Sequence, residues 1–135
     1  MARRAAPYYV LEVFLNLTNH PSDRWPAAQR ARAESLAGDI IDEPFPDVPP
    51  DADPAQIAAI GQGILHRVVA RAPAAVLVQG EFTLTFYLVQ QLQSRGIPCF
   101  AATTRRPVET LTRPEGVVEK NSPFDFVQFR RYSDV

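Results

Sequence analysis

The stretch Val76–Phe86 constrains the fold more than any other part of this 135-residue chain. It opens with a short apolar run, Val76–Val78, which is typical of a strand buried on both faces of a sheet. After Gly80, apolar residues recur at helical spacing. A strand–turn–helix unit leaves backbone N–H groups at the helix N-terminus, where anionic ligands tend to bind in parallel sheets. We therefore expect a parallel α/β sheet with a ligand site at the carboxyl ends of its strands.

The rest of the chain supplies the other elements of such a sheet. The predicted strands cover residues 10–17, 39–46, 76–79, 97–102 and a terminal segment, 124–132. The predicted helices begin after an N-cap at Ser22, at Pro54 and at Phe82. Pro44 removes a donor from the second strand, so this strand belongs at an edge. Right-handed crossovers then predict a three-layer Rossmann-like α/β fold with parallel strand order 2-1-3-4, the terminal strand beside the fourth, and helices on both faces.

The composition fits one domain spanning residues 1–135, with residues 1–7 as a loose tail. A formal net charge of -1 gives no global basic field, which argues against long nucleic acid or a membrane surface as partners. No stretch approaches the ~20 apolar residues that a bilayer span needs. A single cysteine, Cys99, cannot form an internal disulfide, so we expect a buried, reduced thiol in a cytoplasmic protein.

The helix after Gly80 carries apolar residues on more than one face. They are Phe82, Leu84, Phe86, Tyr87, Leu88, Val89 and Leu92. One face would cover the sheet, and the surplus predicts a second packing surface. A homodimer is the simplest explanation.

His20 is the most interesting polar residue, because it lies just beyond the first strand and beside a helix N-terminus. There an imidazole could act as an acid or a base on a phosphate ester, an effect typically worth ~10²–10⁴-fold. The alternative is a histidine that fixes its own turn, and position alone leaves both open. His66 projects opposite the apolar stripe of its helix and is interpreted as a solvated surface histidine.

Arg105 follows two threonines, Thr103 and Thr104, at the end of the fourth predicted strand. A guanidinium group binds phosphate through two hydrogen bonds, and the threonine hydroxyls can add to these. The alternative is an arginine that points into solvent, which we favour for Arg106. Lys120 would reach a phosphate only if the last loop folds over the crevice, which the sequence does not decide.

The turn after the central strand offers two further candidates. Gly80 would permit close approach of a ligand to the backbone, although such turns often contain glycine without binding anything. Glu81 could accept a hydroxyl proton or cap the following helix, and capping is the favoured interpretation.

Metal-binding patterns are missing from the sequence, which has no CxxC, no HExxH and no close His/Asp cluster. We therefore predict neither a metal nor a cofactor. The acidic residues in and beside the second predicted strand are interpreted as a solvated rim: Asp39, Asp42, Glu43, Asp47 and Asp51. Without a Walker loop, a GxGxxG fingerprint or a GxSxG elbow, the sequence also argues against P-loop, dinucleotide and serine hydrolase enzymes.

Four short segments carry a resemblance to a known family: Leu15–Ser22, Val78–Thr83, Cys99–Arg105 and Phe126–Tyr132. They resemble small CRISPR-associated proteins of the CARF type (CRISPR-associated Rossmann fold), which include the stand-alone Csx and ring-nuclease groups. The resemblance implies a homodimer whose two crevices join into one pocket for a cyclic oligoadenylate second messenger. Ring-nuclease relatives cleave that ring without metal, by attack of a ribose 2′-hydroxyl on the adjacent phosphate.

On this resemblance, His20 would act as general acid or base and Arg105 would stabilise charge on the phosphorane. The candidate ligand-binding residues are Thr18, Asn19, Ser22, Gly80, Glu81, Thr83, Thr103, Thr104 and Lys120. Two other functions compete with a ring nuclease. A sensor or sponge would bind the ligand and release it unchanged, and with no effector domain in the sequence it would need a separate partner. A protein-interaction subunit would instead dock a protein through the aromatic helix face around Phe86 and Tyr87.

Overall fold

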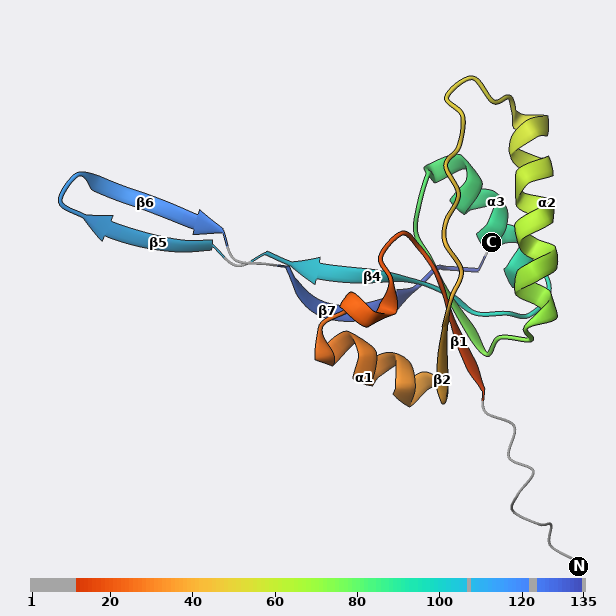
Figure 1. The fold of residues 1–135 in the computed structure, drawn as a ribbon, viewed down its shortest axis with the longest axis horizontal. Helices are drawn as coiled ribbons and strands as arrows, with labels where there is room; N and C mark the ends of the chain where they lie inside the picture. The colour runs from red at the N-terminus through yellow and green to blue at the C-terminus, as the bar shows by residue number, and fades with distance from the viewer. Residues whose placement is uncertain (1–11, 107, 122–123, 135) are drawn as a thin grey trace, which may run out of the picture.

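The computed structural model describes residues 12–106, 108–121 and 124–134, and Figure 1 shows its arrangement. Its main sheet has five strands in the order β2-β1-β3-β4-β7. The strands are β1 (Val13–Leu17), β2 (Asp39–Asp42), β3 (Ala75–Val78), β4 (Cys99–Arg105) and β7 (Asp125–Arg131). The first four are parallel and β7 runs antiparallel to β4. The predicted Rossmann-like α/β fold and strand order are confirmed.

Three α-helices in the described ranges cover the sheet: α1 (Ala27–Leu36), α2 (Pro54–Ala70) and α3 (Phe82–Gln93). In Figure 1, α2 and α3 lie together on one face and α1 lies on the other. The pleat separates the side chains of β1, so that Leu15 and Leu17 join the core beneath α2 and α3 while Phe14 joins Ala33 of α1 and Phe129 of β7. The sheet is therefore buried on both faces, as its apolar strands predict.

Helix α2 follows its sequence pattern closely. Asp53 accepts a hydrogen bond from the N–H of Gln56, whose side chain accepts in return from the N–H of Asp53, and Pro54 is the first helical residue. The predicted apolar stripe faces the sheet with Ile57, Gly61, Ile64, Leu65 and Val68 buried. The helix start and the buried face are both confirmed.

The helix predicted from Ser22 to Gly38 is wrong at its beginning. A single 3₁₀ turn, η2 (Ser22–Arg24), is followed by extended backbone at Trp25, and α1 begins at Ala27. The ring of Pro26 disfavours the helical conformation at the preceding residue, which explains the break at Trp25. The Ser22 hydroxyl donates to Asp42 instead of capping a helix.

Two strands end several residues away from their predicted ends. β2 ends at Asp42, short of the predicted Pro46, but it lies at the sheet edge as expected. β4 continues to Arg105, beyond the predicted end at Ala102, because β7 pairs with it as far as Arg105 opposite Asp125. Thr103–Arg105 therefore lie within the strand and not just beyond its end.

A two-stranded hairpin connects β4 to β7 and extends away from the main sheet in Figure 1. Its strands are β5 (Val108–Arg113) and β6 (Gly116–Asn121), which stand where the sequence predicted only a loop. Lys120 lies opposite Glu109 in the hairpin register, and its side chain is outside the described part of the structure. The predicted tail, residues 1–7, is also outside the described residues.

Candidate functional site

The order of the strands creates a topological switch point at the carboxyl ends of β1 and β3. These strands are neighbours, but β1 leads toward α1 on one face of the sheet and β3 leads to α3 on the other (Figure 1). Ligands of open α/β sheets bind at such a reversal. We call this switch point the switch crevice, after the place where a ligand is expected. It is bordered by the loop Thr18–Ser22 after β1 and the turn Gln79–Glu81 after β3.

Hydrogen bonds fix the backbone of His20 on both sides. Its carbonyl oxygen accepts from Asn16 Nδ2 at 2.9 Å and from Trp25 Nε1 at 3.0 Å. Its N–H donates to Thr18 Oγ1 at 3.1 Å. These hydrogen bonds therefore hold His20 in the loop through its main chain, and its side chain takes no part in them.

A polar network beneath the loop supplies this anchoring. Asn16 is completely buried, donates to Asp42 Oδ1 at 2.9 Å, and accepts from Thr18 Oγ1 at 2.8 Å. The Ser22 hydroxyl donates to Asp42 Oδ2 at 3.2 Å, and the Ser22 N–H also points to this carboxylate. Asp42 thus ties the loop to the edge strand, so its interpretation as part of a solvated rim was incomplete.

The loop presents a subset of its polar side chains to solvent. Thr18 and Ser22 are buried, and their hydroxyls are engaged within the network. Asn19 and His20 are exposed. Among the described residues, no hydrogen bond reaches the imidazole of His20, which bears on the two alternatives left open by the sequence. The backbone of His20 stabilises the turn, and its imidazole ring is free to contact a ligand.

The turn after β3 is shaped by packing. A side chain at Gly80 would overlap the ring of Phe45, which is buried. The packing of Phe45 is therefore sufficient to require this glycine, and close approach of a ligand to Gly80 stays a prediction. Beside it, Gln79 Oε1 accepts from the N–H of Ala102 at 3.0 Å and continues the β3–β4 contact past the end of β3.

The N-terminus of α3 is occupied by a carboxylate. Glu81 accepts from the N–H of Leu84 at 2.8 Å and from Thr83 Oγ1 at 2.6 Å. These two hydrogen bonds, that of Thr83 first, lower the pKa of Glu81 from its ordinary value. The capping interpretation of Glu81 is confirmed, and the N–H of Leu84 is not open to a ligand anion.

The β4 side of the crevice carries the arginines. Thr103 Oγ1 donates to the carbonyl of Gln128 on β7 at 3.2 Å, whereas Thr104 and Arg105 are exposed. With neighbouring strands about 4.8 Å apart, β4 lies roughly 10 Å from β1 across β3. Arg106 is exposed, as favoured from the sequence, and its guanidinium group also lies over the ring of Phe124 at 4.0 Å from the centroid.

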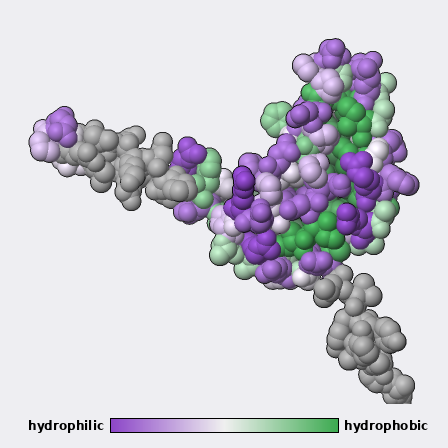
Figure 2. Space-filling model, viewed as in Figure 1, coloured by the Kyte–Doolittle hydropathy of each residue, from purple (hydrophilic) through white to green (hydrophobic). Residues whose placement is uncertain are grey.

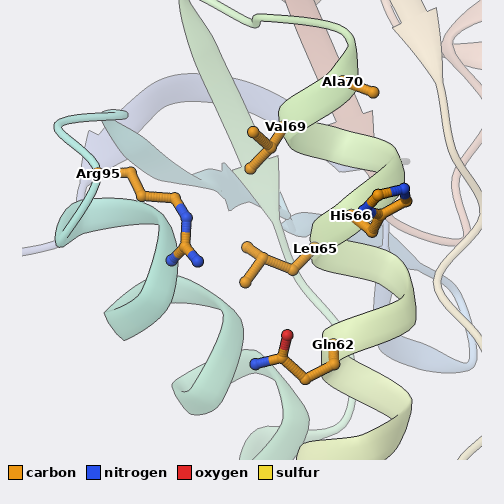
Figure 3. A pocket seen from close by; sticks show the side chains of 6 residues that line it. All are labelled: Gln62, Leu65, His66, Val69, Ala70 and Arg95. Carbon is orange, nitrogen blue, oxygen red and sulfur yellow. The ribbon is translucent and has the colours of Figure 1, made fainter.

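Two hollows lie between α2 and α3, away from the loop of His20. The first is a cavity of about 260 Å³, and Figure 3 shows the side chains that line it: Gln62, Leu65, His66, Val69, Ala70 and Arg95. Helices of a βαβ unit run antiparallel to the strands, so this cavity, near the carboxyl ends of both helices, lies toward the amino edge of the sheet. His66 is exposed there, as predicted.

The second hollow, which we call the α2–α3 groove, lies between the N-terminal halves of these helices and has a volume of about 370 Å³. It is lined by Ala52, Pro54, Ile57, Thr83, Phe86, Tyr87 and Gln90. Its lining is mainly apolar. On the face visible in Figure 2, hydrophobic residues gather beside α2, and most of the other residues on that face are hydrophilic.

Other reactive groups do not add to the site. Cys99 is a free, completely buried thiol as predicted, and burial raises its pKa to about 12, which removes the thiolate needed for nucleophilic attack. Within residues 12–106, 108–121 and 124–134, no three His, Cys, Asp or Glu side chains form a group that could hold a metal ion. No helix in these ranges is long and apolar enough to cross a bilayer.

Fold and crevice together define a Rossmann-like α/β protein with a candidate ligand site at its topological switch point. The chain belongs to the uncharacterized protein MJ1673 family, whose model matches residues 12–130. That match includes both segments that border the switch crevice and the β5–β6 hairpin. No curated protein and no solved structure matches the chain.

Proposed function

We propose that the protein binds a cyclic oligoadenylate at the switch crevice and cleaves it as a metal-independent ring nuclease. The observation that carries this proposal is the presentation of His20, whose main chain is held by Asn16 and Trp25 while its imidazole is exposed. A titratable side chain on a fixed backbone at a ligand-binding edge suits acid–base catalysis. The resemblance of the loop segments to CARF proteins supplies the ligand class.

In the proposed reaction, a ribose 2′-hydroxyl loses its proton and its oxygen forms a bond to the adjacent phosphorus. The bond from phosphorus to the 5′-oxygen breaks, and that oxygen leaves with a proton, so the product is linear and ends in a 2′,3′-cyclic phosphate. His20 acts as the acid or the base. Arg105, exposed at the end of β4, stabilises the charge that develops on the phosphoryl oxygens. Asn19, exposed beside His20, is placed to donate to the ligand.

The test is to incubate the protein with cyclic tri-, tetra- or hexa-adenylate in excess EDTA and to separate the products by chromatography. A ring nuclease yields linear products with cyclic phosphate ends. Recovery of intact ligand from a complex would show a sensor or sponge instead. If the protein neither binds nor cleaves any of the three rings, the proposal is wrong, and an interaction subunit that docks through α3 becomes the leading candidate.

The same proposal includes a homodimer formed through α3. Phe86 is 64% exposed and borders the α2–α3 groove. A protruding aromatic ring beside an apolar hollow is self-complementary, because two copies related by a two-fold axis can each insert Phe86 into the hollow of the other. Such a dimer would bring two crevices close enough to share one cyclic ligand.

Phe86→Glu is expected to convert the dimer into a monomer, because it places a charge where an apolar contact is proposed. Light scattering after gel filtration at tens of micromolar protein measures this change. Phe124→Glu is the matched control, since Phe124 is also an exposed aromatic residue, at 54%, but lies outside α3 and the groove. A wild-type protein that is monomeric under these conditions would contradict the proposed dimer.

A further inference from the structure

Phe82 has the most exposed large apolar side chain among the described residues, with 88% of its surface accessible. It is the first residue of α3 and directly follows the Gly80–Glu81 turn of the switch crevice. Neither apolar core cluster includes it. An isolated exposed aromatic is common on protein surfaces, but here the ring lies at the edge where the ligand is expected.

The charges around this turn determine which part of a ligand, charged or uncharged, could contact Phe82. The N-terminus of α3 would ordinarily attract a phosphate, but Glu81 places its carboxylate there and accepts from Leu84 and Thr83. The ionised carboxylate repels a second anion. The nearest arginines in the strand order lie at the end of β4, next to β3 on the side away from β1, where Arg105 is exposed and Arg106 lies over the ring of Phe124. The carboxyl edge of the sheet therefore offers an aromatic, anion-repelling group at the start of α3 and a cationic group, Arg105, at the end of the neighbouring strand.

The separation of the aromatic ring from the arginine predicts how a nucleotide ligand would be oriented. We infer that Phe82 is a stacking platform for one nucleobase of the ligand, while the sugar–phosphate chain faces Arg105. A base is flat and uncharged, so it can lie beside Glu81 without the repulsion that a phosphate would meet. Stacking between bases and aromatic side chains is a common way to hold single-stranded nucleic acid. The inference rests on the proposed function for the class of the ligand.

The competing explanation is that Phe82 belongs to the dimer contact. Phe82 and Phe86 are one helical turn apart on α3, so a single partner surface could cover both rings. The two explanations predict different behaviour. A stacking residue affects ligand affinity and leaves the dimer intact, whereas an interface residue changes the oligomeric state first.

The test compares binding of cyclic tetra-adenylate and cyclic hexa-adenylate by isothermal titration calorimetry. All proteins carry His20→Ala so that the ligand stays intact during the measurement. Phe82→Ala is expected to weaken binding by about tenfold or more, and Phe82→Trp is expected to retain it because indole also stacks. Val69→Ala serves as the control, since Val69 is an exposed apolar residue of the cavity in Figure 3, away from the switch crevice.

Each outcome supports or overturns the inference. A loss of affinity in Phe82→Ala with an unchanged dimer mass and with Val69→Ala unaffected supports stacking. If Phe82→Ala binds the ligand with unchanged affinity, the stacking inference is wrong while the proposed function stands. The stacking inference is also wrong if the affinity falls only together with dissociation of the dimer. If the parent protein binds neither ring, the proposed function fails together with the inference, and this result is visible before any Phe82 variant is compared.

Discussion

His20→Ala is expected to slow the cleavage of cyclic oligoadenylate by about 10²–10⁴-fold, the usual contribution of a positioned acid or base. The imidazole is exposed and accepts no structural hydrogen bond among the described residues, so its removal should leave the loop and the fold in place. Single-turnover rates with protein in excess and EDTA present isolate the chemical step from product release. Ligand affinity, measured separately, should change much less than the rate.

The matched control is His66→Ala. His66 is also exposed, but it lies on α2 beside the cavity of Figure 3, away from the switch crevice. Its removal should leave the cleavage rate unchanged. Equal rates for wild type and His20→Ala would exclude His20 as the acid or base, even if the protein cleaves the ring.

Asn16→Leu is expected to lower the free energy of unfolding by about 3 kcal/mol, because three hydrogen bonds of the buried amide are lost. Leucine has the same branching of side-chain heavy atoms but a larger volume, so this loss is not caused by a cavity, and the added volume can only increase it. Thr18 Oγ1 loses its acceptor, while Asp42 and the carbonyl of His20 each lose a donor. Urea unfolding followed by circular dichroism measures the change. The variant should also cleave more slowly, because the backbone of His20 is less firmly held.

Asn19→Leu provides the comparison within the same loop. Asn19 is exposed, so its replacement should change the unfolding free energy by no more than about 0.5 kcal/mol. If Asn16→Leu were as stable as Asn19→Leu, the network beneath the loop would not be the anchor of His20. The proposed preorganisation of the site would then lose its structural basis.

The strand order could be predicted because its signals are local and repeated. Apolar runs mark the buried strands, Pro44 marks the edge, and the apolar stripe of α2 marks its buried face. The start of α1 was predicted wrongly because two local signals conflict. Ser22 favours a helix start, but Pro26 disfavours helix at Trp25, and the restriction by proline is the stronger effect.

The site was only partly visible in the sequence, because its anchoring contacts join distant segments. Asn16 and Asp42 are 26 residues apart and meet only because β1 and β2 pair in a register that places them opposite each other. The one available signal was an amide in a fully buried strand, a position that requires hydrogen-bond partners. Similarly, Gly80 is explained by Phe45, and the length of β4 by β7, neither of which is adjacent in sequence.

Trp25 gives the switch crevice its own optical probe. It is the one tryptophan of the chain, its indole N–H donates to the carbonyl of His20, and its ring packs near Phe14 and Phe129. Its emission therefore reports on a single place, the junction between the loop of His20 and the core beneath α1. Movement of that loop would change the polarity around the indole, so the arrival of a ligand can be followed through intrinsic fluorescence without any label.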